Sequence, residues 1–363
     1  MHSFHFRAVT ILLSAFSILS LPQPAGASSQ HPATGIPVRL AADYVHAVIE
    51  AGRTTYSKAI VDRLHQNLKA TENWRQDRTL LLPAQFLLNS SKISNERGIG
   101  MRYRLMSLWP INPNNSPQTK NEKLGLEEVV RNPEKPFTWI VQREDMWYYE
   151  AIYPDRAVTE TCASCHNSHA KSPKTDFKKG DVMGGIVIDL PLGKRFSKTA
   201  DIRIPPEVVT DYIFSILESD RTVYAKNIVE RLGKQNIIQA REDWQTANAL
   251  MLPAQFLMHT SDRMREKNLD LDFELISLWP INPDHGPSGE FERTGLEAVA
   301  IHPIRPYMGH IQVGRKHFFQ AVYPDRAVTP ACVTCHNAHP KSPKRDFKLH
   351  DVMGGFVITL PLN

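Results

Sequence analysis

The chain repeats itself over nearly its whole length, and this duplication restricts its fold more than any other feature. Residues 162–185 match residues 332–355 at 17 of 24 positions. At the same spacing of 170 residues, further matches join 83–87 to 253–257, 107–113 to 277–283, and 153–159 to 323–329. Solenoid repeats have much shorter periods. The sequence therefore predicts two copies of one domain.

The repeat also predicts where each copy begins and ends. We expect the first domain at residues 32–195, a linker at 196–206 and the second domain at 207–363. Pro205 and Pro206 lie in the linker, where they would interrupt a continuous helix. A chain of 363 residues is long enough for two hydrophobic cores. We expect the two halves to separate as folded units when the linker is cut.

The apolar pattern predicts the same order of elements in each copy. In the first copy we expect helices at 37–66, 80–90 (starting near Pro83) and 122–131, and strands at 100–109, 137–141, 146–153 and 182–190. The segment from 162 to 166 falls on a loop or short helix before the last strand. This order is typical of an α+β domain, a small antiparallel sheet with helices on one side.

The N-terminus has the features of a secretory signal peptide over residues 1–27. Arg7 precedes an apolar run of 14 residues, 8–21, and small residues occupy 25–27. The run is short for a membrane span, although a retained anchor remains the alternative. No later segment is apolar enough to span a membrane. We therefore expect export to the periplasm, with no membrane span after cleavage.

All four cysteines lie in two copies of the pattern C-x-x-C-H, at residues 162–166 and 332–336. This pattern is the attachment site of a covalently bound c-type haem. The attaching thiols would be those of Cys162, Cys165, Cys332 and Cys335. His166 and His336 would be the proximal iron ligands. A zinc site would need ligands from both copies or further histidines, and a redox dithiol needs no following histidine. The sequence thus predicts two haem c groups.

The distal iron ligand is not fixed by the sequence. Donors that occur at matching places in both copies are His169 with His339, Met183 with Met353, and Tyr56 with Tyr224. A hydrogen bond near the haem edge is the other role for these histidines. Core packing is the other role for the methionines and tyrosines. An open or water-filled sixth position is a further alternative.

Charged residues near the motifs suggest how the haem and a partner would be held. Arg156 and Arg326 are candidate ligands of the haem propionates, because a guanidinium group fits a carboxylate. The formal charge of +5 is mild. It fits an acidic partner, but no dense run of Lys and Arg with interleaved aromatic residues indicates nucleic acid.

The residues around the motif resemble a known family. The motif with its tail at 162–169, the segment 172–178, the Gly-Asp-x-x-Gly at 180–184 and the turn at 105–115 carry the resemblance. They resemble a PAS-like, Cache-like family of c-type haem sensor domains, a Tll-type domain of unknown function. That family occurs in periplasmic parts of chemoreceptors, histidine kinases and cyclases, and as a stand-alone cyanobacterial haem protein.

The resemblance implies tandem PAS-like domains with one haem each, and two departures qualify it. His350 replaces the glycine before Asp351, and no spare cysteine is present as a distal ligand.

Two functions remain open at this point. Two covalent haems without a recognisable output domain favour a dihaem cytochrome that carries electrons to an acidic redox partner, and not an enzyme. The family resemblance favours the alternative, a sensor of redox state or of a small gas ligand that acts through a separate partner. A peroxidase would need acid and base residues on the distal side, and the sequence indicates none.

Overall fold

Two helices of equal length begin the two repeats. The computed structural model describes residues 35–197 and 201–362, so the expected signal peptide at 1–27 lies outside the described residues. Helix α1 (Val38–Thr55) continues into a π-helical segment, η1 (Tyr56–Asp62), and α5 (Pro206–Val223) continues into η3 (Tyr224–Glu230). Short strands β1 (Ile36–Pro37) and β8 (Arg203–Ile204) precede them and pair with each other. The predicted long helix is confirmed.

The remaining elements follow the predicted order in both repeats. The first repeat contains β2 (Ala70–Thr71), β3 (Leu80–Leu81), α2 (Pro83–Asn95), β4 (Arg102–Met106), η2 (Pro113–Asn115), α3 (Lys120–Arg131), β5 (Phe137–Arg143), β6 (Met146–Arg156), α4 (Glu160–Ser168) and β7 (Val182–Gly193). The second contains α6 (Arg231–Lys234), α7 (Pro253–Arg265), β9 (Asp272–Ile276), η4 (Pro283–His285), α8 (Glu290–Ile301), β10 (Tyr307–Val313), β11 (Lys316–Arg326), α9 (Pro330–Ala338) and β12 (Val352–Leu362).

Each repeat builds one four-stranded antiparallel sheet. The strand orders are β4-β7-β6-β5 and β9-β12-β11-β10. The register shifts between Asp155 and Arg156, and between Asp325 and Arg326, at the end of the strand that leads to the motif. Such a bulge bends a strand and changes the direction of the chain. The α+β fold class and the two repeated domains are confirmed.

Helices cover both faces of each sheet, so the expectation of helices on one side was wrong. On β7, Ile186 and Ile188 pack in the cluster that contains α1, whereas Val187 packs with Leu126 of α3. The strand is apolar on both faces because successive side chains point to opposite sides. A strand that is apolar throughout needs cover on both faces.

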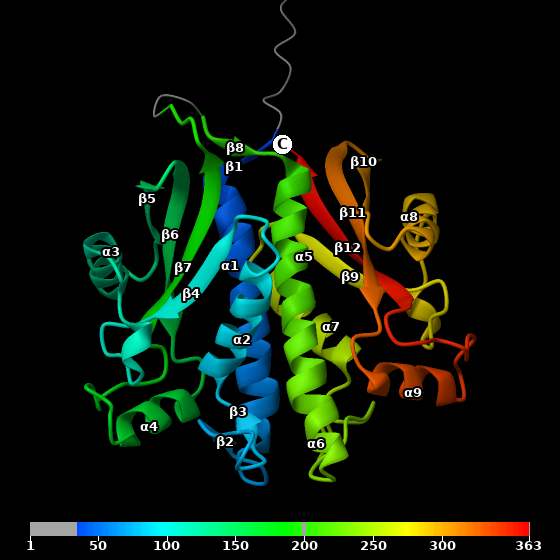
Figure 1. The fold of residues 1–363 in the computed structure, drawn as a ribbon, viewed down its shortest axis with the longest axis horizontal. Coiled ribbons are helices and arrows are strands. Elements are labelled where there is room, and N and C mark those ends of the chain that lie inside the picture. The colour runs from blue at the N-terminus through cyan, green and yellow to red at the C-terminus, as the bar shows by residue number, and fades with distance from the viewer. Residues whose placement is uncertain (1–34, 198–200, 363) are drawn as a thin grey trace, which may run out of the picture. The chain divides into compact units, whose positions relative to one another are not determined.

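The two repeats share their hydrophobic cores. Helix α1 contacts α5 and α7, and α2 contacts α5 (Figure 1). One cluster joins residues of both sheets to both long helices. A second cluster contains Tyr56 stacked on Phe86 and Tyr224 stacked on Phe256, with centroids 4.4 and 4.5 Å apart. Phe86 and Phe256 meet edge to face at 5.7 Å across the repeat boundary.

None of the helices within residues 35–197 and 201–362 combines the length and the apolar character that crossing a bilayer requires.

Candidate haem attachment sites

The first motif forms helix α4, which the sequence left open between a loop and a helix. Thr159 caps its N-terminus, since its side-chain oxygen accepts a hydrogen bond from the backbone N–H of Cys162 at 3.3 Å. Successive residues of a helix turn by about 100°, so Cys162, Cys165 and His166 lie within an arc of roughly 100°. In the second repeat Pro330 occupies the first position of α9, which suits the fixed φ of proline.

One side of α4 is anchored in a small apolar cluster. Ala163 is buried there together with Ala157, Phe177 and Met183, and Trp109 packs against them. The equivalent cluster of the second repeat contains Ala327, Phe347 and Met353, with Trp279. All four cysteine thiols are free, and Cys165 and Cys335 are exposed. The buried side of the helix therefore fixes its orientation while a thiol faces outward.

The histidine of each motif, the candidate proximal ligand, is partly buried beside an aromatic ring. The rings of His166 and Phe177 meet edge to face at 6.0 Å, and those of His336 and Phe347 at 6.2 Å. Burial lowers the pKa of His166, and the charge of Arg53 lowers it further. Burial and Arg221 lower the pKa of His336 in the same way. Both imidazoles are therefore neutral at neutral pH, the form that binds a metal.

The tail after each motif is fastened to the helix by an asparagine. Asn167 donates its side-chain N–H to the carbonyl of Phe177 at 2.8 Å and accepts from the backbone N–H of Phe177 at 2.9 Å. Asn337 makes the same two hydrogen bonds to Phe347, at 2.9 and 3.0 Å. The same paired bonds therefore fasten the tail in both repeats.

The tail then returns to the strand that precedes the motif. Gly180 N–H donates to the carbonyl of Ala157 at 2.9 Å, and Ala157 N–H donates to that of Asp181 at 2.9 Å. Gly180 has φ of 92°, and His350 in its place has φ of 73°, both in the left-handed region. Glycine adopts this region freely, whereas histidine does so at some cost in energy. The turn is kept in the second repeat despite the substitution.

A buried ion pair that the sequence did not indicate lies near each motif. Arg53 at the end of α1 contacts Asp155 at 2.9 Å, and Arg221 contacts Asp325 at 2.7 Å. All four side chains are at most 9% exposed. Arg221 also donates two hydrogen bonds to the carbonyl of Arg326, at 3.1 and 3.0 Å. These pairs join the long helices to the strands that lead into the motifs.

The candidate distal methionines are buried in the apolar clusters that lie against α4 and α9. Met183 is 6% exposed and Met353 is 5% exposed. Met183 lies in the cluster against which Cys162 packs, and Met353 in the one against which Cys332 packs. The packing is that of core residues, and their role as ligands stays a prediction.

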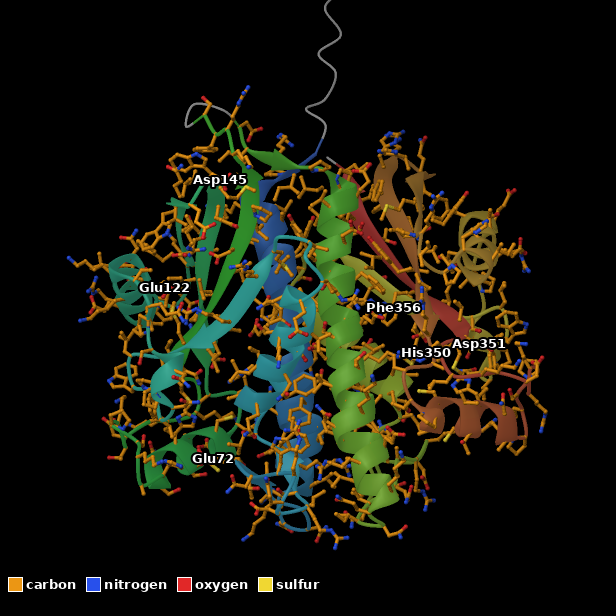
Figure 2. The ribbon with its side chains drawn as sticks, in the orientation of Figure 1. Glu72, Glu122, Asp145, His350, Asp351 and Phe356 are labelled. Carbon is orange, nitrogen blue, oxygen red and sulfur yellow. The ribbon has the colours of Figure 1, made fainter. Side chains whose placement is uncertain are left out.

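The candidate distal histidines are held by neighbouring groups. His169 Nδ1 accepts a hydrogen bond from the backbone N–H of Lys171 at 3.1 Å, and its Nε2 lies 3.5 Å from a carboxyl oxygen of Glu72. Figure 2 labels Glu72 near α4. His339 has the same arrangement, with Nε2 3.1 Å from Glu242. Both ring nitrogens are thus engaged, which favours the hydrogen-bonding role.

Tyr56 and Tyr224 are fully buried, and their hydroxyl groups donate to the carbonyls of Leu81 at 2.9 Å and Met251 at 3.0 Å. They belong to the core that the two repeats share.

The two candidate propionate ligands have different surroundings. Arg156 contacts Glu134 at 2.7 Å and donates to the carbonyls of Pro133 at 3.1 Å and Gly180 at 3.2 Å. Arg326 donates to the carbonyl of Pro303. Arg156 is therefore neutralised by a carboxylate of its own repeat.

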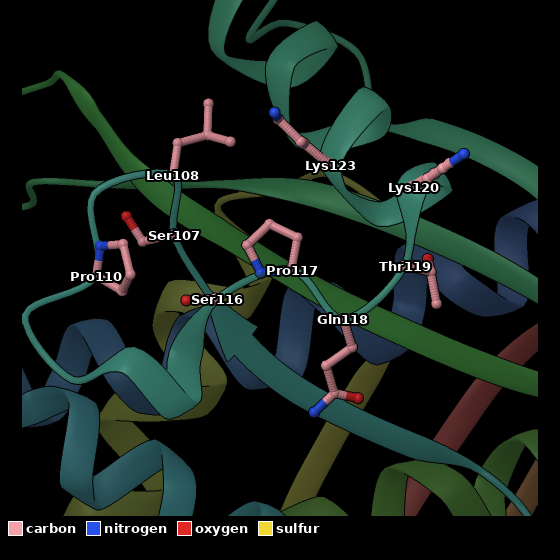
Figure 3. Close-up of a pocket in the computed structure, with 9 residues that line it drawn as sticks. All are labelled: Ser107, Leu108, Pro110, Ser116, Pro117, Gln118, Thr119, Lys120 and Lys123. Carbon is pink, nitrogen blue, oxygen red and sulfur yellow. The ribbon is translucent and has the colours of Figure 1, made fainter.

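Two surface pockets lie away from the motifs. One of about 280 Å³ is bounded by the loop after β4 and the first turn of α3, where Ser107, Pro110 and Lys123 line it (Figure 3). Another of about 170 Å³ is lined by residues that include Met258 and His285. The two pockets occupy different places in the two repeats. Neither matches a group that binds once per repeat.

The residues of each motif fit a covalently attached haem. Free thiols at positions 162 and 165 share a helix face with a neutral imidazole, and the second repeat has the same set. In the part of the chain that the structure describes, no three His, Cys, Asp or Glu side chains converge as a metal site. The zinc alternative therefore lacks a ligand set among these residues.

Comparison with known proteins gave one finding. Searches of curated proteins and of solved structures found no match to the chain. A family model described as Tll0287-like matches residues 37–191 and again residues 208–361. These two matches cover most of the chain and coincide with the two repeats. The chain therefore belongs to the Tll0287-like family and contains two copies of its domain in tandem.

Proposed function

We propose that this chain is a periplasmic dihaem cytochrome that binds one haem c in each repeat and carries electrons without substrate turnover. The observation that carries the proposal is the repeated arrangement of free thiols and a neutral imidazole on one face of α4 and of α9. Bound haem supplies reversible one-electron chemistry at its iron.

The residues of the chain would hold the haem in a fixed orientation. Cys162 and Cys165 would form the thioether links, and His166 would present a ring nitrogen whose proton affinity is lowered by burial and by Arg53. The ring of Phe177 limits rotation of the imidazole, and the paired hydrogen bonds of Asn167 fix the end of the helix. Lysines such as Lys171 and Lys341 are exposed after the motifs, which suits an acidic redox partner.

One observation favours the alternative, a haem-based sensor of redox state or of a small gas. The hydroxyl of Thr161 in α4 donates to the carboxylate of Asp62 in η1. The π-helical segment lies at the end of the long helix in the core that both repeats share. A change at the first haem could thus reach the boundary between the repeats. π-helical segments are frequent at functional sites.

Protein-film voltammetry distinguishes these functions. The protein is expressed with the haem attachment machinery, and the film is scanned under nitrogen, then under carbon monoxide and nitric oxide. A carrier gives two reversible one-electron waves whose potentials do not change with the gas. A gas-dependent shift of either wave contradicts the carrier and supports the sensor.

A further inference from the structure

The two repeats differ on one exposed surface beside the motif. Three positions carry charged residues in the first repeat and apolar residues in the second: Arg131 becomes Ile301, Glu134 becomes Ile304, and Lys179 becomes Leu349. The apolar side chains are 71%, 82% and 43% exposed. Single exposed apolar residues are common, whereas a group of them marks an interaction surface.

The three apolar residues lie on two backbone segments that are joined to Arg326 or to the residue after it by hydrogen bonds. Its guanidinium donates to the carbonyl of Pro303, the residue before Ile304, and Ile301 ends α8 three residues earlier. On the other side, His350 N–H donates to the carbonyl of Ala327 at 3.0 Å, which places Leu349 and His350 next to Arg326. Figure 2 shows His350 and Asp351 at the start of β12. We call Ile301, Ile304, Leu349 and Arg326 the Ile304 patch.

The first repeat shows that one arginine reaches both sides of this surface. Arg156, the equivalent of Arg326, contacts Glu134 on one side and the carbonyl of Gly180 on the other. Arg326 keeps the first of these contacts, since it donates to the carbonyl of Pro303, the residue before Ile304.

The charge of this surface is balanced in the first repeat and unbalanced in the second. Arg156 pairs with Glu134 at 2.7 Å, and Arg131 pairs with Glu128 at 2.6 Å. In the second repeat, Ile304 and Ala298 occupy the positions equivalent to Glu134 and Glu128, so both acidic partners are replaced. Over residues 35–197 and 201–362, no carboxylate forms an ion pair with Arg326.

The charges at the rim of the patch are mostly basic, although Glu297 is exposed one helical turn before Ile301. Arg305 and Lys348 are exposed, and His350 is exposed as well. The carboxylate of Asp351 accepts a hydrogen bond from the backbone N–H of Lys348 at 2.8 Å and is turned into its own loop. The patch therefore offers an unpaired cation within an apolar surface and a basic rim.

We propose that the Ile304 patch is a docking surface for an acidic protein that places a carboxylate against Arg326 and apolar side chains against its isoleucines. A guanidinium binds a carboxylate through a charge-assisted fork. An apolar centre with a charged rim is typical of protein interfaces. The small size of the patch fits a transient complex. Arg326 is six residues before Cys332, so the partner docks beside the second motif.

The evidence that the Ile304 patch is a docking surface comes from the comparison of the two repeats. A redox role for the partner rests on the proposed function. Two other occupants would give different results. A second copy of the chain would bind in a concentration-dependent manner, and a haem propionate on Arg326 would exclude an added carboxylate.

The two isoleucines allow a direct test by methyl NMR on the haem-loaded protein. Isoleucine δ1 methyl groups are labelled, and a peptide with the core Leu-Glu-Leu is titrated against a matched peptide with Leu-Gln-Leu. The methyl signals of Ile301 and Ile304 are expected to shift saturably with the glutamate peptide and not with the glutamine peptide. Ile152, one of the buried isoleucines of the first repeat, is the internal control.

Reciprocal variants use the repeat as its own control. Ile304→Glu restores the ion pair of the first repeat and is expected to weaken peptide binding at least ten-fold. Glu134→Ile combined with Arg131→Ile and Lys179→Leu frees Arg156 and copies the patch onto the first repeat, so this variant is expected to create a second binding site.

The proposal is overturned if the two peptides shift the methyl signals of Ile301 and Ile304 equally, or if raising the protein concentration alone shifts them. It is also overturned if the glutamate peptide binds only after haem is removed, or if Ile304→Glu leaves the peptide affinity unchanged. If the chain attaches no haem, the proposed function is contradicted. If that haem-free chain still binds the glutamate peptide, the docking surface is supported independently.

Discussion

At the scale of single residues, the most unusual group is the buried carboxyl of Asp220. It lies on α5 at the repeat boundary, opposite Gly52 of α1, which is its equivalent in the first repeat. A β-carbon at position 52 would overlap the Asp220 carboxyl oxygen, so glycine permits this close approach. Burial raises the pKa of Asp220 to about 7, although the Ser90 hydroxyl lowers it in part. Burial raises the pKa of the nearby Tyr103, and the charge of Asp220 raises it further.

The raised pKa of Asp220 predicts a loss of stability with rising pH. An unfolded aspartate ionises near pH 4, whereas the folded protein keeps this proton until about pH 7. Between these values the folded state binds more protons, so the free energy of unfolding falls as pH rises. Denaturant unfolding at pH 5 and pH 8 should show this fall in the wild type. Asp220→Asn should reduce it by about 2–4 kcal/mol.

The matched control is Asp145→Asn, because Asp145 is an exposed partner of Lys194. Its pH dependence should equal that of the wild type. An unchanged pH dependence in Asp220→Asn would show that the buried carboxyl is not the source.

The sequence located the motif residues but not the groups that surround them. The cysteines and histidines follow a fixed short spacing, so they can be recognised from a short stretch of sequence. Arg53 and Asp155 are 102 residues apart, and their pairing depends on the packing of α1 against the sheet. A signal existed, since Arg53 with Arg221 and Asp155 with Asp325 occupy matching places in the two repeats. The matching residues form ion pairs because folding packs each long helix against its sheet.

At the scale of elements, α4 and the tail that follows it form one unit through Asn167. Asn167→Ala would leave the N–H and carbonyl of Phe177 without their side-chain partner. The expected cost is about 1–3 kcal/mol of local stability. Hydrogen exchange should become faster at the Phe177 amide, while the Phe347 amide in the second repeat stays protected and is the internal control. Equal exchange at Phe177 in variant and wild type would contradict the role of this asparagine.

The regular elements could be predicted because each has its own apolar period. The long helices, the β5–β6 hairpin and the final strands agree with the pattern. The π-helical segments η1 and η3 could not be predicted, since the residues from Tyr56 and Tyr224 continue an ordinary helical pattern. The pairing of β1 with β8 joins residues that are far apart in sequence and has no local signal. The helix that covers the second face of each sheet was missed because its contacts also join residues that are far apart in sequence.

At the scale of the whole molecule, the two repeats are held together by shared cores. Beyond these cores, Glu50 contacts Lys267 at 2.5 Å, and Arg97 pairs with Glu218. Arg63 donates to the carbonyls of Ala247 and Ala249 across the boundary. The family matches at 37–191 and 208–361 fall within the expected domains 32–195 and 207–363, whose exact boundaries stay a prediction.

Because of these contacts, the two halves are expected to stay together after the linker is cut. The sequence alone led us to expect two separate halves, but separation would expose both shared cores to water. A protease site placed at residues 198–200 should therefore yield two fragments that co-elute in gel filtration at the position of the uncut protein. Two peaks, each at the size of one folded half, would contradict a shared core.

The central claim is that each repeat attaches one haem through its own motif. Intact mass spectrometry of protein exported with the haem attachment machinery tests it most directly. The account predicts the mass of the chain from Ser28 plus two haems. Replacing Cys332 and Cys335 by serine should remove one haem and leave the other. A mass equal to the bare polypeptide would contradict the account.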